Sequence, residues 1–355
     1  MKDGTVARSR SVYLDIVKGF AMICVVFGHC IQFGSGREFL SNTLFFDNIV
    51  FKTIYSFHMP LFMLVSGFLF AYSSEKRTWN EQLKRQATSL LIPIAIWALV
   101  PFASEIAMLA DSNQYIGLLE ALKTYLFVTL NNLWFLWAVF WCSAVVIIVR
   151  QFFNDSKRVY AFGFLLTFFI PDTLGLYLYK FMYPFFIAGY FFNKGNCITK
   201  LQKIVANSLT IWLFAVFFLL LLSFYDRDSY IYTTGYSLIR GTPMRQLKID
   251  MYRFFIGFAG SALVLLLIHR ILPVLHGEIK RIVGYFGTNS FGIYIISGYL
   301  FSYFVPKMTA SLPRINYVVT IMETMLVLLV SHFCVKWIQK NKLLCKLLFG
   351  GRGVH

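Results

Sequence analysis

Long apolar stretches separated by short basic segments dominate the pattern of this chain. An α-helix needs about 20 mostly apolar residues to cross the hydrocarbon core of a bilayer. Read with a window of about 19 residues, the chain shows about ten such stretches. They lie near 12–34, 48–72, 88–110, 132–150, 159–175, 177–193, 204–225, 252–272, 283–305 and 316–338. The pattern predicts an all-α polytopic integral membrane protein with about ten transmembrane helices. Prolines interrupt the fifth and sixth stretches, which we expect to form short or broken helices.

The composition supports this class. The 355 residues are 58% hydrophobic and 14% charged, whereas a soluble domain carries about a quarter charged residues. No internal repeat and no separate soluble domain is visible, so residues 1–355 read as one transmembrane domain with short tails at about 1–11 and 340–355. The polar start leads into an apolar stretch too long for a signal peptide, without an A-x-A-like site, so no cleavable signal is expected.

The basic residues predict the orientation in the membrane. The net charge is +17, and Lys and Arg favour cytoplasmic loops. With ten spans and the N-terminus inside, the inner segments carry roughly twice as many Lys and Arg residues as the outer ones. We therefore expect both termini in the cytoplasm and the polar segment 226–250 outside. The charge is spread over many short loops, which does not favour nucleic-acid binding.

The cysteines indicate no redox or metal chemistry. They show no CxxC pair and no metal-ligand spacing, and most lie in or beside apolar stretches. We interpret them as small buried hydrophobic residues. They are Cys24, Cys30, Cys142, Cys197, Cys334 and Cys345.

The first span carries three polar residues that a membrane helix would normally avoid. A charge at the bilayer centre costs about 2.5–3.5 kcal/mol on insertion scales. At 100° per residue, Asp15, Lys18 and His29 share one face of the helix. Asp15 and Lys18 are spaced to pair with each other. His29 lies further out, and we expect it to have no partner in its own helix.

A second histidine lies at a similar depth in the next span. His58 is followed by Pro60, which removes a helical hydrogen bond, and by Gly67, which allows another helix to approach closely. Two histidines on adjacent antiparallel helices indicate a shared site, although a bond to a backbone carbonyl would equally explain His58. Glu105 and Glu323 could orient an imidazole, but interfacial polarity explains both more simply.

Six stretches, in order along nearly the whole chain, resemble the motifs of membrane-bound acyltransferase family 3. These multi-span O-acyltransferases modify bacterial surface sugars and nodulation factors. The motif "LDIVKGFAMICVVFGH" resembles the first-span signature, which ends in the histidine regarded as catalytic. The other five are "FHMPLFMLVSGFLF", "LKRQATSLLIPIAIW", "LWFLWAVFW", "YPFFIAGYFF" and "GTNSFGIYIIS". Many members carry Arg where this chain has Lys18, and His where it has Ser297, so the roles of these two positions carry over less directly.

The resemblance implies transfer of an acyl group, most simply acetyl, from acyl-CoA to a glycan hydroxyl. His29 would be the general base, since a positioned base contributes about 10²–10⁴-fold. His58 would orient the donor or acceptor, and Asp15 would pair with Lys18.

The charge and position of other residues indicate where the two substrates of such a reaction would bind. Lys18 and the basic loop residues Lys84, Arg85 and, more weakly, Arg77 would hold the phosphates of coenzyme A, unless the loop charge only sets topology. Sugar contacts are expected from Asn131, Asn132 and Trp134, for which an interfacial belt is the alternative.

The expected partners are acetyl-CoA or another acyl-CoA as a co-substrate, a glycan or lipid-linked sugar as acceptor, and membrane lipid. No permanently bound cofactor, metal or nucleic acid is expected, and the expected location is the bacterial cytoplasmic (inner) membrane. Two other classes remain open from sequence. A glycan or lipid transporter or flippase would share the many spans and buried charges. A non-catalytic membrane scaffold would leave the deep histidines unexplained.

Overall fold

The computed structural model describes residues 12–74, 77–111, 117–194, 208–239, 242–312 and 315–351, and all regular elements in these ranges are helices. The predicted tail at 1–11 and Cys197 lie outside the described residues. Six helices are long and apolar enough to cross a membrane, judged by length and composition. They are α1 (Val12–Phe33), α3 (Ile49–Ser74), the continuous run Trp79–Leu109, α8 (Trp134–Phe152), α14 (Pro243–Ile271) and α18 (Tyr317–Gln339).

The other helices are shorter or more polar. The run from Trp79 contains α4 (Trp79–Gln86), one π-helical turn η2 (Ala87–Leu91), α5 (Ile92–Trp97) and the start of α6 (Leu99–Asp111). The remaining longer helices are α7 (Leu118–Asn131), α9 (Lys157–Thr167), α10 (Leu176–Lys194), α12 (Ser208–Ser223), α15 (Gly277–Thr288), α16 (Ser290–Tyr303) and α19 (Lys342–Phe349). Short helices at the loops are α2 (Arg37–Ser41), η1 (Leu44–Asp47), η3 (Arg227–Ser229), α13 (Ile231–Thr234) and α17 (Val305–Met308).

Most predicted spans coincide with helices, and three segments differ. The stretch 159–175 is helical only to Thr167, because Pro171 and the turn after it cannot continue the helix. The stretch 283–305 is divided between α15 and α16 at Asn289. The polar segment 226–250 ends inside α14, which begins at Pro243. The structure supports a polytopic all-helical protein, while the number of about ten spans and the orientation of the termini stay predictions.

Glycine pairs bring the central helices into close contact. Added Cβ atoms at Gly67 of α3 and Gly189 of α10 would lie 2.0 Å and 1.9 Å from the carbonyl oxygens of Phe186 and Leu64. The two helices therefore approach each other at reciprocal glycines, as small residues allow in membrane interfaces. The expectation that Gly67 admits a neighbouring helix is confirmed. Helix α1 lies at the centre and packs against α3, α14, α15, α16 and α18.

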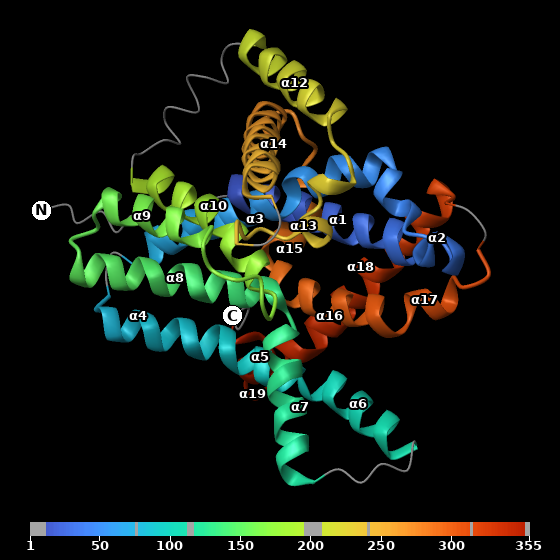
Figure 1. The fold of residues 1–355 in the computed structure, drawn as a ribbon. Coiled ribbons are helices and arrows are strands. Elements are labelled where there is room, and N and C mark those ends of the chain that lie inside the picture. Colours follow the sequence, from blue (N-terminus) through green and yellow to red (C-terminus); the bar gives the residue numbers. More distant parts are fainter. Residues whose placement is uncertain are drawn as a thin grey trace, which may run out of the picture.

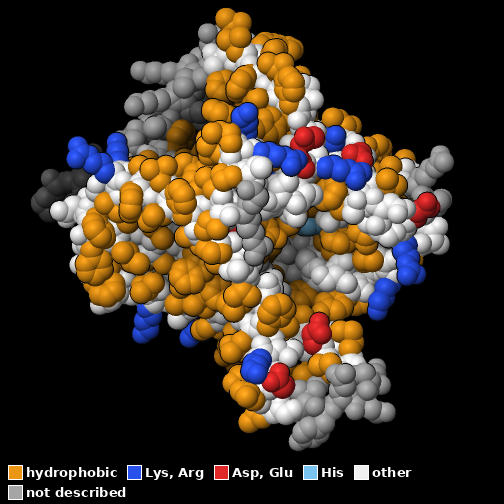
Figure 2. All heavy atoms as spheres, in the orientation of Figure 1, with side chains coloured by type: hydrophobic (Ala, Val, Ile, Leu, Met, Phe, Trp, Pro, Cys, Tyr) orange, Lys and Arg blue, Asp and Glu red, His pale blue; other side chains and the backbone are white. Residues whose placement is uncertain are grey.

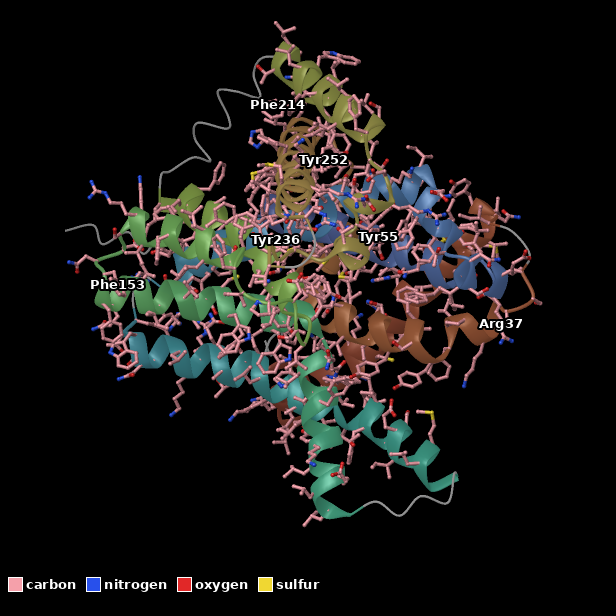
Figure 3. The ribbon with its side chains drawn as sticks, viewed as in Figure 1. Arg37, Tyr55, Phe153, Phe214, Tyr236 and Tyr252 are labelled. Atoms are coloured by element: carbon pink, nitrogen blue, oxygen red, sulfur yellow. The ribbon has the colours of Figure 1, made fainter. Side chains whose placement is uncertain are left out.

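The helices form a body with two projections (Figure 1). Helices α6 and α7 make a V-shaped hairpin on one side, and α12 projects on the opposite side. The exposed surface of both projections is strongly apolar, with Trp212 69% and Phe127 59% exposed. Figure 2 shows apolar side chains over much of this face, with a hollow near its centre. In Figure 3, Arg37, which follows α1, and Phe153, which follows α8, lie at opposite ends, with Tyr55 between them.

Candidate active site

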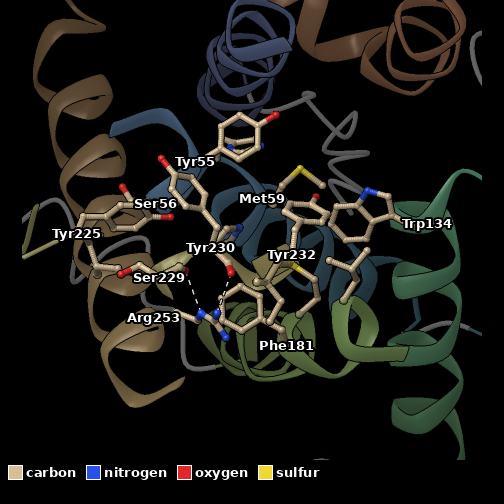
Figure 4. A pocket seen from close by; sticks show the side chains of 16 residues that line it. Tyr55, Ser56, Met59, Trp134, Phe181, Tyr225, Ser229, Tyr230, Tyr232 and Arg253 are labelled. Atoms are coloured by element: carbon tan, nitrogen blue, oxygen red, sulfur yellow. Dashed lines mark hydrogen bonds between the residues drawn. The ribbon is translucent and has the colours of Figure 1, made fainter. Parts of the chain in front are cut away.

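A small pocket surrounds the predicted second histidine, and we call it the outer pocket because the predicted orientation places it towards the outside. Its volume is about 40 Å³. Side chains of α3, α10, α14, the start of α8 and the loop 225–232 line it (Figure 4). Most of them are aromatic or apolar, and the polar ones are few. The lining residues that matter below are Tyr55, Ser56, His58, Met59, Trp134, Phe181, Met182, Tyr225, Tyr230, Tyr232 and Arg253.

His58 lies in the wall of the outer pocket with one nitrogen engaged. The residue is 3% exposed, and its Nδ1 lies 2.7 Å from the carbonyl oxygen of Ile54. A carbonyl can only accept, so Nδ1 carries the hydrogen and Nε2 of a neutral imidazole is the proton acceptor. The described residues place no hydrogen bond on Nε2. The bond to Ile54 is the backbone bond that the sequence analysis gave as the alternative explanation of His58. It engages Nδ1 only and leaves Nε2 available as an acceptor.

His29 lies behind Tyr55 and does not line the outer pocket. The Tyr55 hydroxyl is 3.1 Å from His29 Nδ1 and 3.2 Å from Gln32 Oε1. Gln32 Oε1 is itself 3.4 Å from His29 Nδ1. The expectation that His29 has no partner in its own helix is therefore wrong, because Gln32 lies one turn further along α1 and reaches back.

Tyr55 links the two histidines. Its hydroxyl contacts His29, and its ring lies 4.7 Å from the His58 ring, centroid to centroid. The structure thus brings the two predicted histidines to one tyrosine, with His58 and Tyr55 facing the outer pocket and His29 behind them. Tyr55 and Gln32 were not predicted from the sequence as site residues. The only signal was their spacing of three residues from His58 and His29, respectively.

Arg253 is a further buried group at the pocket, and it was not predicted from the sequence as a site residue. It pairs with Asp250 at 2.7 Å, and both side chains are almost completely buried. Its remaining N–H groups donate to backbone carbonyls of η3, at Asp228 and Ser229, and of the segment after it, at Tyr230 and Gly235, and it also contacts the Thr234 hydroxyl. Every N–H group of this guanidinium is engaged, so Arg253 fixes the loop that supplies Tyr230 and Tyr232 to the pocket.

A second ion pair anchors the other end of this loop. Asp172, in the turn between α9 and α10, lies 2.6 Å from Lys180 and accepts from the backbone N–H groups of Tyr236 and Ser237 at 2.7 and 2.8 Å. Burial raises the pKa of Asp172, but the hydrogen bond from Lys180 and those two N–H groups outweigh it, so the pKa lies below its usual value. Gly235, with φ of 69°, makes the turn that presents these N–H groups.

A larger cavity lies on the other side of Met59, and we call it the inner cavity. Its volume is about 590 Å³. Lys18 and Arg85 both line it, although they come from α1 and α4. Hydroxyl groups and apolar side chains form the rest of the wall, including Met22, Val25, Phe62, Ser66, Ser89, Phe135, Thr288, Ser290 and Tyr294. The cavity therefore offers two cations, several hydrogen-bonding groups and an apolar depth.

The C-terminal helix α19 closes one wall of the inner cavity. Gly350 and Gly351, at its end, line the cavity, and Cys345 and Phe349 of α19 are buried. The Trp97 indole donates to the Leu348 carbonyl at 3.0 Å. The segment predicted as a cytoplasmic tail thus contains a packed helix that contributes to the cavity.

Other predicted donor-site residues lie outside the inner cavity. Lys84 and Arg77 are exposed and absent from its wall, and Arg77 donates to the Ser73 carbonyl at 2.6 Å. Asp15 is partly buried on α1, where its backbone packs against Gly287 of α15. The predicted pairing of Asp15 with Lys18 stays a prediction.

The three predicted sugar-contact residues separate in the structure. Trp134 lines the outer pocket. Asn132 donates to the Tyr299 hydroxyl at 2.8 Å, and Asn131 donates to the Phe127 carbonyl of its own helix at 2.8 Å. Neither asparagine lines the outer pocket. Ser297 is buried and donates to the Tyr294 carbonyl at 3.3 Å.

The two glutamates considered from sequence also differ in setting. Glu105 is exposed on α6, which fits interfacial polarity. Glu323 has both carboxyl oxygens buried, with no hydrogen-bond partner among the described residues, and packs against Gly34 at the end of α1. The prediction of buried cysteines is confirmed for Cys24, Cys30, Cys142 and Cys345, whereas Cys334 on α18 is only partly buried.

The chain is similar in sequence to two nodulation proteins. Nodulation protein NolL of Sinorhizobium fredii is 28% identical over 302 residues, which cover 83% of this chain and 79% of that protein. Nodulation protein NolL of Mesorhizobium japonicum is 27% identical over 216 residues, which cover 61% of this chain and 54% of that protein. No solved structure matches.

The family comparison extends over nearly the whole chain. A family profile described as an acyltransferase domain matches residues 11–345, from the start of α1 to the middle of α19. This range includes all the residues that line the outer pocket, from α3, α8, α10, α14 and the loop 225–232, and most of those around the inner cavity. The chain therefore belongs to the acyltransferase family 3 that its sequence motifs resemble.

Proposed function

We propose that the protein is a membrane O-acyltransferase that moves an acetyl group from acetyl-CoA to a hydroxyl of a cell-surface or lipid-linked glycan. The observation that supports this most is the meeting of two unlike cavities at Met59 beside His58 and Tyr55. The inner cavity has the cations for a phosphorylated donor. The outer pocket has the aromatic side chains that commonly face sugar rings, and an imidazole. We propose the bacterial cytoplasmic membrane as its location.

In the proposed donor complex, acetyl-CoA occupies the inner cavity from the cytoplasmic side. Lys18 and Arg85 hold its phosphates, since cations bind phosphate by charge-assisted hydrogen bonds. The hydroxyl-bearing residues Ser66, Ser89 and Ser290 offer further hydrogen bonds, and the apolar depth formed by Met22 and Phe62 suits the pantetheine arm. The thioester then reaches Met59.

The proposed acceptor complex places a sugar at the opening of the outer pocket, with one hydroxyl reaching into it. Trp134 and Tyr232, which both line the pocket, would contact the sugar ring, and His58 Nε2 would accept a hydrogen bond from one of its hydroxyls. Since Nδ1 of His58 is held by Ile54, the imidazole keeps one orientation without the sugar. His58 is thus the positioning group for the acceptor.

We assign the role of general base to His29, acting through Tyr55. The attacking hydroxyl passes its proton to the Tyr55 oxygen as Tyr55 passes its own to His29 Nδ1. The new C–O ester bond forms as the C–S thioester bond breaks, and the proton then neutralises the coenzyme A thiolate. Before the reaction the Tyr55 hydroxyl donates to Gln32 Oε1 at 3.2 Å, so its one hydrogen must turn to His29 Nδ1, 3.1 Å away, for the transfer to occur.

The decisive experiment is acyl transfer by the purified protein. Acetyl-CoA labelled in the acetyl group is incubated with the protein in lipid vesicles and a panel of glycosides. We expect alkali-labile label on a glycoside and release of free coenzyme A thiol. A transporter would instead move glycoside into the vesicles without using acetyl-CoA, and that result would overturn the proposal.

A further inference from the structure

We infer that Met59 is the filter for acyl-chain length, and that the outer pocket selects a short, uncharged acyl group. This inference rests on the proposed function and adds the class of acyl group to it. Among the described residues, Met59 is the one side chain that lines both the inner cavity and the outer pocket. An acyl group delivered from the inner cavity to a hydroxyl in the outer pocket must therefore pass this side chain.

The position of Met59 in α3 makes it a natural boundary. It lies between His58, which faces the outer pocket, and Pro60, which cannot donate a helical hydrogen bond. Met59 is 9% exposed, so it is packed in place and has little room to turn aside. Its unbranched side chain nevertheless adapts its shape more readily than Leu or Ile could.

The size of the outer pocket sets the limit on the group that enters it. A volume of about 40 Å³ holds about three water molecules. That is as many as the non-hydrogen atoms of an acetyl group, and fewer than those of a butyryl or succinyl group. Each extra methylene group that a tight apolar pocket must reject changes discrimination by about 10–200-fold.

The charge of the pocket excludes an acyl group that ends in a carboxylate. Arg253 is the one Lys or Arg side chain in the described lining of the outer pocket. All its N–H groups are engaged with Asp250 and with the backbone and side chain of the loop above. A succinyl carboxylate would find no free cation there, and an unpaired buried charge is strongly unfavourable.

Three buried methionines allow a matched test. Met59 lines both cavities, Met22 lines the inner cavity alone, and Met182 lines the outer pocket alone. Each is changed to Ala in the full-length protein in vesicles. Release of free thiol is measured with acetyl-, propionyl-, butyryl- and succinyl-CoA, with the glycoside panel or water as acceptor.

For the wild type, we expect acetyl-CoA to be preferred, with butyryl- and succinyl-CoA at least about tenfold poorer. Met59→Ala should raise the kcat/KM ratio of butyryl- to acetyl-CoA by about tenfold. Met22→Ala should change both rates by the same factor, because Met22 lines the inner cavity alone. Met182→Ala enlarges the outer pocket without opening the passage at Met59, so it should raise the ratio less than Met59→Ala does. Succinyl-CoA should stay poor in Met59→Ala, because the missing cation is not restored. Met59→Val serves if Met59→Ala does not fold, with a smaller rise expected.

Several outcomes would overturn the filter. An active Met59→Ala with the wild-type ratio would show that Met59 does not limit chain length. A shift in Met22→Ala equal to that in Met59→Ala would place the limit in the inner cavity, and a larger shift in Met182→Ala would place it in the outer pocket rather than at Met59. Equal use of butyryl- and succinyl-CoA by the wild type would refute the argument from charge. A wild type that uses no acyl-CoA at all would instead refute the proposed function.

Discussion

The inner cavity and the outer pocket differ in size, in lining and in the use of their charged residues. The inner cavity is about 590 Å³ and is lined by hydroxyl groups, apolar side chains and two cations from separate helices. The outer pocket is about 40 Å³, mostly aromatic, and bounded by a loop that two ion pairs hold. The inner cavity suits affinity for a large charged ligand, whereas the outer pocket suits selection at the reacting atoms.

The two regions also differ in how their charges are used. Lys18 and Arg85 lie in the wall of the inner cavity. Arg253 and Lys180, near the outer pocket, are buried and committed to the protein itself. Buried charges of this kind are costly unless every hydrogen bond is made, and Arg253 meets that condition. A cation in the wall of a pocket can bind a ligand only through N–H groups that are not already hydrogen-bonded to the protein, and Arg253 has none left.

The largest expected effect is a loss of turnover when the proton path beside the outer pocket is removed. His29→Gln and Tyr55→Phe should each lower kcat by about 10²–10⁴-fold, because each removes one step of the proton path. His58→Ala should raise the acceptor KM and keep residual turnover. Kinetics of labelled acetyl transfer measure both.

His332→Gln, a histidine on α18 that lines neither cavity, is the matched control and should be unaffected. Wild-type turnover by His29→Gln would remove the base from its assigned place. A fully active Tyr55→Phe would exclude the relay while leaving His29 itself open to a direct role.

The next effect compares the buried ion pair Arg253–Asp250 with the exposed pair Arg245–Asp228 in their contribution to stability. Arg253→Met leaves Asp250 buried without its partner, a change that costs about 3–5 kcal/mol. We expect a lower thermal midpoint and a higher acceptor KM, with the donor KM unchanged. Arg245→Met, which removes the exposed partner of Asp228, should cost about 0–1 kcal/mol. Equal losses in the two variants would show that the clamp has no special role.

The inner region should respond through its donor KM. Replacing Lys18 and Arg85 together with Gln should raise the KM for acetyl-CoA roughly tenfold or more, since charged hydrogen bonds contribute about 1.5–3 kcal/mol each. The acceptor KM should not change. Replacing Lys84 and Arg77 with Gln removes the same charge from residues outside the cavity wall. If this control pair raises the donor KM as much, local loop charge and not the cavity holds the phosphates.

The smallest effect concerns pH and the second anchor of the loop. Because the folded pKa of Asp172 lies below its usual value, its stabilisation is present above the unfolded pKa of about 3.9. That stabilisation is lost as the pH falls through the lower, folded pKa. Wild type should therefore exceed Asp172→Asn in thermal midpoint by a few degrees at neutral pH. The difference should shrink below about pH 4. A difference that is constant with pH would assign the effect to packing.

The sequence by itself determined the class of the protein and its first chemical landmarks. Apolar stretches of membrane-spanning length are a local property, so the helices at 12–34, 48–72 and 316–338 could be predicted almost to the residue. The intramembrane position of His29 and His58 was equally visible, because an ionisable residue stands out against an apolar helix. Proline predicted the break after Thr167, although not its extent. The same expectation was wrong for the sixth stretch, where α10 continues through Pro184.

Tertiary structure decided what those landmarks touch. Which side chains share a wall depends on how helices cross, and reciprocal glycines such as Gly67 and Gly189 set that approach. It brought Arg85 to Lys18 and left Lys84 outside, although the two basic residues are neighbours in sequence. Packing of the helices also buries Arg253 beside Asp250, where it holds the loop of the outer pocket, and places Met59 between two cavities. Side-chain composition is written along the chain, but burial and partnership arise only when distant segments meet.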